Sequence, residues 1–151
     1  MENTSLAQNK SKKIKLDFKD SKYATGRRKK SIARVWVKKG SGNIHVNGIK
    51  MSDYFKRPVH QLIVTRPLEI SEVASSYDVK CAVKGGGLSG QAGAIILGIS
   101  KALIAHDENL KKSLKKDKLT TRDSRVVERK KYGHRKACLL YTSPSPRDNR
   151  W

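Results

Sequence analysis

Cysteine is scarce in this sequence, which contains only two cysteines in 151 residues. Cys81 lies within an alternation of apolar and polar residues, whereas Cys138 lies close to the C-terminal end. Two cysteines in such different settings form neither a disulfide framework nor a metal site. The cysteine content therefore indicates a reducing compartment.

Long hydrophobic runs are absent as well. The longest apolar stretch, residues 92–105, is interrupted by two glycines, Ser100 and Lys101. It is shorter than the roughly 18 to 20 residues that span a membrane, so no membrane partner is expected. Residues 1–20 have no apolar core, which excludes a secretory signal, and their acids argue against an organellar transit peptide.

The sequence also offers no constellation for catalysis or metal binding. None of the histidines has a Cys, Asp or Glu partner at the spacing of a zinc site. No combination of Ser, His and Asp forms a nucleophile elbow. The sequence therefore predicts no enzyme, no metal and no cofactor. The histidines are His45, His60, His106 and His134.

Acidic residues are few, and the cations that outnumber them are unevenly placed. The chain has 34 Lys and Arg against 13 Asp and Glu, a net charge of +21. Residues 1–39 hold 13 cations and 3 acids, residues 40–110 hold 7 and 6, and residues 111–137 hold 12 and 3. Cationic flanks around a nearly neutral middle are typical of arms that bind nucleic acid.

The middle of the chain predicts one α/β domain. Apolar alternation and turn residues predict strands at residues 32–37 and 43–46, which form a hairpin, and at residues 77–83. Asn47-Gly48 predicts a tight turn after the second strand. Helical segments are predicted at residues 51–55, at 59–73 with a kink or break at Pro67, at 88–105 and at 111–118. From Leu119 onward we expect an extended, charged segment with nothing to hold it on the core.

A glycine-rich motif, GGGLSG at residues 85–90, lies between a predicted strand and a predicted helix. It matches the pattern GxGxxG, but a dinucleotide site needs a second strand ending at Asp107 or Glu108, and none is predicted there. Close packing of the helix start on a strand is the favoured interpretation. A third alternative is that the exposed amides of the helix start also meet an RNA phosphate.

Two cationic segments are the candidate RNA-binding arms. Four adjacent cations at residues 27–30 repel one another unless phosphate neutralises them. Residues 122–136 are the counterpart, with Tyr132 and His134 available to stack on bases. Such a segment is expected to order against RNA.

Three blocks of sequence resemble a known family. They are YATGRRKKSIARV at residues 23–35, GGGLSGQAGAI at 85–95 and LTTRDSRVVERKKYG at 119–133. In this order they resemble the ribosomal protein S9 family of the small subunit, in its bacterial or organellar branch. The resemblance covers about residues 22–137.

The resemblance implies a fold and a division of the chain. The fold is of the α/β class, a two-layer α+β domain of the ribosomal S5 domain 2-like type. Its mixed four-stranded sheet packs on helices and contains a left-handed βαβ crossover, an exception to the usual handedness. Residues 1–21 are then a disordered basic extension, 22–118 the core domain, and 119–137 an extended basic tail that binds ribosomal RNA (rRNA).

The resemblance also implies a structural constituent of the small ribosomal subunit in the cytoplasm, an organelle remaining open. Its partners are the rRNA of the subunit head, neighbouring head proteins and, through the tail, the transfer RNA (tRNA) in the P site. The implied rRNA-binding residues are Tyr23, Thr25, Gly26, Arg27, Arg28, Lys29, Lys30, Arg34, Arg122, Arg125, Arg129, Lys130, Lys131, Tyr132 and Gly133. The residues implied to lie near the tRNA are His134, Arg135 and Lys136.

The C-terminal end departs from the family. Residues 138–151, CLLYTSPSPRDNRW, are poor in cations where the family's tail continues with basic residues. We hypothesise that this end is foreign, for example a translated cloning adaptor, which would remove residues that reach the tRNA. Two alternative functions stay open: a non-ribosomal RNA-binding or RNA-processing protein, and a phosphate-binding enzyme of the same fold.

Overall fold

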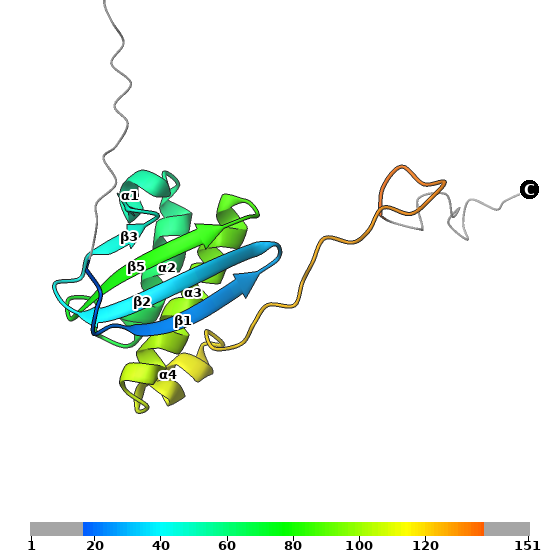
Figure 1. Ribbon diagram of the computed structural model, residues 1–151. Coiled ribbons are helices and arrows are strands. Elements are labelled where there is room, and N and C mark those ends of the chain that lie inside the picture. The colour runs from blue at the N-terminus through cyan, green and yellow to red at the C-terminus, as the bar shows by residue number, and fades with distance from the viewer. Residues whose placement is uncertain (1–16, 138–151) are drawn as a thin grey trace, which may run out of the picture.

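The protein folds as a sheet with helices packed on one of its faces (Figure 1). This computed structural model describes residues 17–137, so the predicted foreign end and most of the predicted disordered extension lie outside it. The strands are β1 Lys22–Arg28, β2 Ser31–Lys39, β3 Ile44–Val46, β4 Ile49–Lys50 and β5 Tyr77–Lys84. The helices are α1 Met51–Tyr54, α2 Pro58–Ile70, α3 Leu88–His106 and α4 Leu110–Lys116.

The sheet is mixed and has five strands, in the order β1-β2-β5-β3-β4. The sheet therefore has one strand more than the four that were expected. β3 and β5 are parallel, and the other neighbours are antiparallel. The Asn47-Gly48 turn is confirmed and joins β3 to β4, with Asn47 at a φ of 52° and Gly48 at 81°.

The predicted hairpin between residues 32–37 and 43–46 is wrong, because β5 lies between β2 and β3. The loop after β2 closes over the start of β5. There the backbone N–H groups of Ser41 and Asn43 each donate to a carboxylate oxygen of Asp78 at 2.9 Å. These bonds hold the loop across the start of β5. β3 therefore pairs with the edge of β5 that lies away from β2. The hairpin that does form joins β1 to β2, and its first strand lies in a stretch that the sequence marked only as a cationic arm.

The core lies between the sheet and α3. Alternate residues of β2 and β5 are buried, and α3 covers them with small and aliphatic side chains. The predicted strand at 77–83 and the predicted buried helix at 88–105 are both confirmed. By length and composition α3 could cross a membrane, but 61% of its apolar window is buried inside the protein, as in the core helix of a soluble domain. The core side chains of β2 and β5 are Ala33, Val35, Val37, Tyr77, Val79, Cys81 and Val83.

Pro67 does not break α2, which continues to Ile70. The helix ends three residues before the predicted Val73, where Glu72 takes a positive φ of 55°. The N–H of Val73 then donates to the carbonyl of Leu68 at 3.0 Å, which satisfies a helix-end acceptor. The helical segments predicted at 51–55 and 111–118 are present as α1 and α4.

Candidate nucleic-acid interface

The tip of the β1–β2 hairpin presents two adjacent lysines. Arg28 pairs with Ser31 across the hairpin, so Lys29 and Lys30 form its two-residue turn, and both are exposed. Lys29 adopts a φ of 52°, a conformation that tight turns often require but that a residue with a side chain seldom takes. The turn therefore holds two cations outward at one end of the sheet.

The glycine-rich motif lies beside this tip. The Ser31 hydroxyl donates to the carbonyl of Gly85 at 3.0 Å, and Gly86 has a φ of 61°. A Cβ at Gly86 would clash with the Ser31 hydroxyl, and one at Gly90 would lie 2.9 Å from it. The glycines thus let the start of α3 pack against the hairpin, as favoured from the sequence.

The described chain after α3 lacks the second strand that a dinucleotide site needs. α3 is followed by α4 and then by the tail, with no further strand up to residue 137. Gly87, Leu88 and Ser89 at the start of α3 are exposed. The contact of this helix start with an RNA phosphate stays a prediction.

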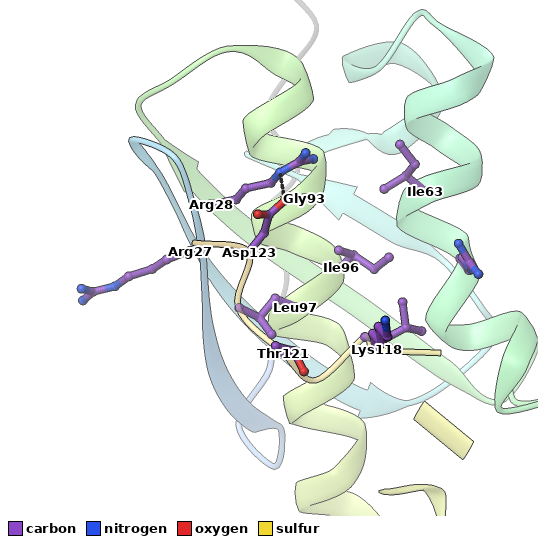
Figure 2. A pocket seen from close by; sticks show the side chains of 11 residues that line it. Arg27, Arg28, Ile63, Gly93, Ile96, Leu97, Lys118, Thr121 and Asp123 are labelled. Carbon is purple, nitrogen blue, oxygen red and sulfur yellow. Dashed lines mark ion pairs between the residues drawn. The ribbon is translucent and has the colours of Figure 1, made fainter. Parts of the chain in front are cut away.

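The tail returns to the hairpin that begins the domain. Nε of Arg28 lies 3.4 Å from a carboxylate oxygen of Asp123. Figure 2 marks this ion pair with a dashed line. Asp123 also accepts hydrogen bonds from Arg125, whose side chain and backbone lower the pKa of this carboxyl to about 2, with a further contribution from the charge of Arg28. The two arms, which lie almost a hundred residues apart in the sequence, therefore meet at one point.

A cavity of about 270 Å³ lies beneath this junction, between the hairpin, α2, α3 and the root of the tail. Its floor is apolar and its rim carries four cations and one acid. In Figure 2 Arg28 turns toward Asp123, while Arg27 points away from the cavity. Leu119 is buried in the core at its edge, so the expectation that nothing from this residue onward is held on the core is wrong, and the described tail leaves the domain only after Leu119. The cations of the rim are Arg27, Arg28, Arg66 and Lys118.

The remaining tail, residues 124–137, has no helix or strand and extends away from the domain (Figure 1). Arg122, Arg129 and Lys130 are exposed, and Tyr132 is 89% exposed. Lys131 is paired with Glu128 at 2.9 Å. The residues implied to lie near tRNA follow Gly133, which has a φ of 70°; of these, Arg135 and Lys136 are exposed and His134 is half-buried.

The other candidate residues of β1 and β2 divide between the two faces of the sheet. Gly26 is buried against α3, where a Cβ would clash with the carbonyl oxygen of Ala94. Tyr23, Thr25 and Arg34 lie on the opposite face, which no helix within residues 17–137 covers and which we call the uncovered face. The hydroxyl of Thr25 donates to that of Tyr23 at 3.1 Å, and the bonds from Thr25 and then Arg34 lower the pKa of Tyr23.

Sequence reasoning missed cations at two places. Arg66 and Lys118 on the cavity rim come together only through packing, and no local pattern reveals them. Lys80 and Lys84 lie on the uncovered face of the sheet. The sequence could have predicted this position, because both lysines alternate with the buried side chains of residues 77–84. Trp36 lies on the same face by the same alternation along β2.

Within the described residues no three His, Cys, Asp or Glu side chains gather as metal ligands. Cys81 is fully buried, and this burial raises the pKa of its thiol, which is therefore protonated and unreactive at neutral pH. Cys138 lies outside the described residues.

Comparison with known families identifies this arrangement. A family model described as ribosomal protein S9/S16 matches residues 26–142, well over half of the chain. The chain belongs to the ribosomal protein S9/S16 family. It is a structural protein of the small ribosomal subunit, acts in translation and is not an enzyme. The phosphate-binding enzyme considered from the sequence is thereby excluded.

The match contains the hairpin from Gly26 onward, the glycine-rich motif and the described tail. Ribosome association and contact with rRNA follow from membership of the S9/S16 family. The match also includes residues 138–142, the first part of the segment hypothesised to be foreign.

Proposed function

We propose that this S9/S16-family protein binds the rRNA of the small-subunit head through one continuous cationic surface. The observation that carries the proposal is the contact between Arg28 and Asp123. It places the hairpin tip, with Lys29 and Lys30, next to the root of the tail, with Arg122 and Arg125. The two cationic arms could have bound separate RNA segments, but both start at the contact between Arg28 and Asp123.

Phosphate neutralisation is the proposed mechanism. Exposed lysines and arginines on the hairpin tip and tail release counterions when they meet phosphate, which gives affinity without reading sequence. The described tail contains two acids beyond Thr121, and both are paired internally: Asp123 with Arg28 and Arg125, and Glu128 with Lys131. These pairs limit the repulsion of phosphate and hold the root of the tail in one direction.

The end of the described tail is proposed to approach the tRNA in the P site. His134, Arg135 and Lys136 lie farthest along the segment that extends from the domain. Neutralising Arg135 and Lys136 together should weaken binding of P-site tRNA to reconstituted subunits without changing assembly of the subunit. Unchanged tRNA binding would contradict this role.

The handedness of the crossover, the compartment and the division of the chain are also part of the proposal. In Figure 1 β3 and β5 run in the same direction and α2 passes behind the sheet between them, which supports a left-handed crossover. We propose a cytoplasmic ribosome, a core at residues 22–118 and an RNA-binding tail at 119–137. Residues 138–151 are proposed to be foreign, and finding the same codons at the 3′ end of the source gene would refute this.

Sedimentation tests the assignment to the ribosome. The protein should migrate with small subunits in a sucrose gradient and stay there after a high-salt wash. A non-ribosomal RNA-processing protein would leave the subunits or sediment with another particle, which would contradict the proposal.

A matched pair of double variants tests the surface itself. Lys29→Gln with Lys30→Gln removes two cations from the hairpin tip, and Lys111→Gln with Lys112→Gln removes two exposed cations from α4. The first should weaken binding to head-domain rRNA and lower the slope of log affinity against log salt by about two. The second should change both much less. Equal effects would show that only total charge matters.

A further inference from the structure

The uncovered face of the sheet carries a row of ring and cationic side chains. Strand register places Tyr23 of β1 opposite Trp36 of β2, Trp36 opposite Lys80 of β5, and Lys80 beside His45 of β3. All four side chains lie on the face away from α3, since their neighbours along each strand pack into the core. The row crosses four strands at the same level.

The rings and cations of this row are in contact. The ring centroids of Tyr23 and Trp36 are 5.3 Å apart and tilted by 50°. The Arg34 guanidinium lies 4.9 Å from the ring centre of Trp36 and 5.8 Å from that of Tyr23. Lys80 lies 5.6 Å from the Trp36 ring centre and 5.9 Å from the ring centre of Phe18, so the start of the described chain lies over this end of the row. Tyr23 is nevertheless 49% exposed, so part of its ring faces solvent.

A hollow of about 500 Å³ continues the row toward the hairpin tip. Ile32 and Ala82 give it apolar surface, and Arg34 and Lys84 provide charge. It is large enough for a nucleobase, and it combines what a base and a phosphate each need.

The charge of this face favours a polyanion. Its strands contribute six cations and one acid, Asp78. The carboxylate of Asp78 lies at the opposite end and is engaged by the N–H groups of Ser41 and Asn43. Asp17 lies beside it, also remote from the hollow. The cations are Arg27, Arg34, Lys38, Lys50, Lys80 and Lys84.

We propose that the uncovered sheet face binds a single-stranded segment of rRNA, with an unpaired base stacked on Tyr23 and its phosphates held by Arg34 and Lys84. Aromatic rings flanked by cations suit unstacked bases, because the ring stacks on the base while the cation meets the backbone. This inference rests on the proposed rRNA binding and adds a third contact region, separate from the hairpin tip and the tail. Unlike the hairpin tip, it would recognise bases as well as phosphates.

The test compares Tyr23→Leu, which removes the ring, with Tyr23→Phe, which keeps it. Affinity of the full chain for a transcript of the head domain is measured over a range of salt. Tyr23→Leu should bind about ten-fold more weakly at every salt concentration, with an unchanged salt slope, because stacking releases no counterions. Tyr23→Phe should bind like the wild type. Lys84→Gln should instead lower the slope by about one.

Several outcomes would overturn the proposal. Equal affinity of Tyr23→Leu and the wild type would exclude stacking, and so would equal losses in Tyr23→Leu and Tyr23→Phe. Normal RNA affinity of Tyr23→Leu, with loss of a neighbouring protein from reconstituted subunits, would assign the face to a protein. Circular dichroism and thermal unfolding of each variant show that the fold is kept. In all these cases steep salt dependence of the wild type would leave the proposed function standing.

Discussion

Arg28 and Asp123 form an ion pair, with Nε of Arg28 3.4 Å from a carboxylate oxygen of Asp123. Arg28 is the last residue of β1, and Asp123 lies at the root of the tail. Both side chains are only partly exposed, at 24% and 31%. The pair therefore links the N-terminal hairpin to the C-terminal tail and sets the direction in which the tail leaves the domain.

Removing the charge of Asp123 should release the root of the tail. Asp123→Asn loses the ion pairs with Arg28 and Arg125, while the core stays intact because the pair lies at the surface. Limited trypsin digestion should cut after Arg122 or Arg125 faster than in the wild type, with little change in melting temperature. Glu128→Gln is the control, since it breaks only the local pair with Lys131. Equal cleavage in wild type and Asp123→Asn would contradict the linking role.

The same contact predicts a pH dependence. Hydrogen bonds from Arg125 and the charge of Arg28 lower the pKa of Asp123 from 3.8 to about 2. A carboxyl with a depressed pKa stabilises the folded arrangement above its ordinary pKa, and this contribution is lost as the pH falls through the folded value. The attachment of the tail should therefore be constant at neutral pH and weaken only below 3.8. A carbon-13 NMR titration of the Asp123 carboxyl should show a midpoint near 2, and a midpoint near the ordinary value would contradict the hydrogen bonds from Arg125 that are the main cause of the lowered pKa.

Gly26 should be required for close packing rather than for direct RNA contact. A Cβ at this position would clash with the Ala94 carbonyl oxygen, and backbone cannot move as a flexible side chain can. Gly26→Ala should destabilise the domain by about 1–3 kcal/mol, measured by urea unfolding. Gly87→Ser is the control, because nothing lies within 4 Å of a Cβ there and serine is a good helix N-cap. A neutral effect of Gly26→Ala would show that β1 and α3 can separate.

Lys29 should contribute to binding at a cost in stability. Its φ of 52° strains a residue with a side chain, and glycine removes that strain. Lys29→Gly should leave stability unchanged or raise it by up to about 1 kcal/mol in thermal unfolding. The same variant should bind rRNA more weakly, with a salt slope lower by about one. Unchanged RNA binding would remove Lys29 from the interface.

The sequence predicted the elements whose signals are local. The apolar alternation at residues 77–83 and the long apolar segment at 88–105 identified β5 and α3, because burial of one face imposes a period on the sequence. The cationic blocks likewise predicted a polyanionic partner, and rRNA contact follows from the family. The strand, the helix and the charge blocks each depend on neighbouring residues only.

Strand order depends on contacts that are distant in sequence, and there the predictions failed. The pairing of residues 32–37 with 43–46 looked like a hairpin, but Asp78 draws the intervening loop over β5. β1 was missed because four consecutive cations hide its alternation, in which Arg28 faces α3 and Arg27 faces solvent. The meeting of the two arms at Arg28 and Asp123 has no signal in either segment alone.

The measurement that tests the account most directly is the salt dependence of binding between the full chain and head-domain rRNA. If the hairpin tip and the tail together neutralise about 6 to 10 phosphates, affinity should fall by roughly 10³-fold or more between ~50 and ~200 mM salt. A flat response, with affinity nearly the same at both concentrations, would contradict the proposal that this cationic surface holds the protein on the ribosome.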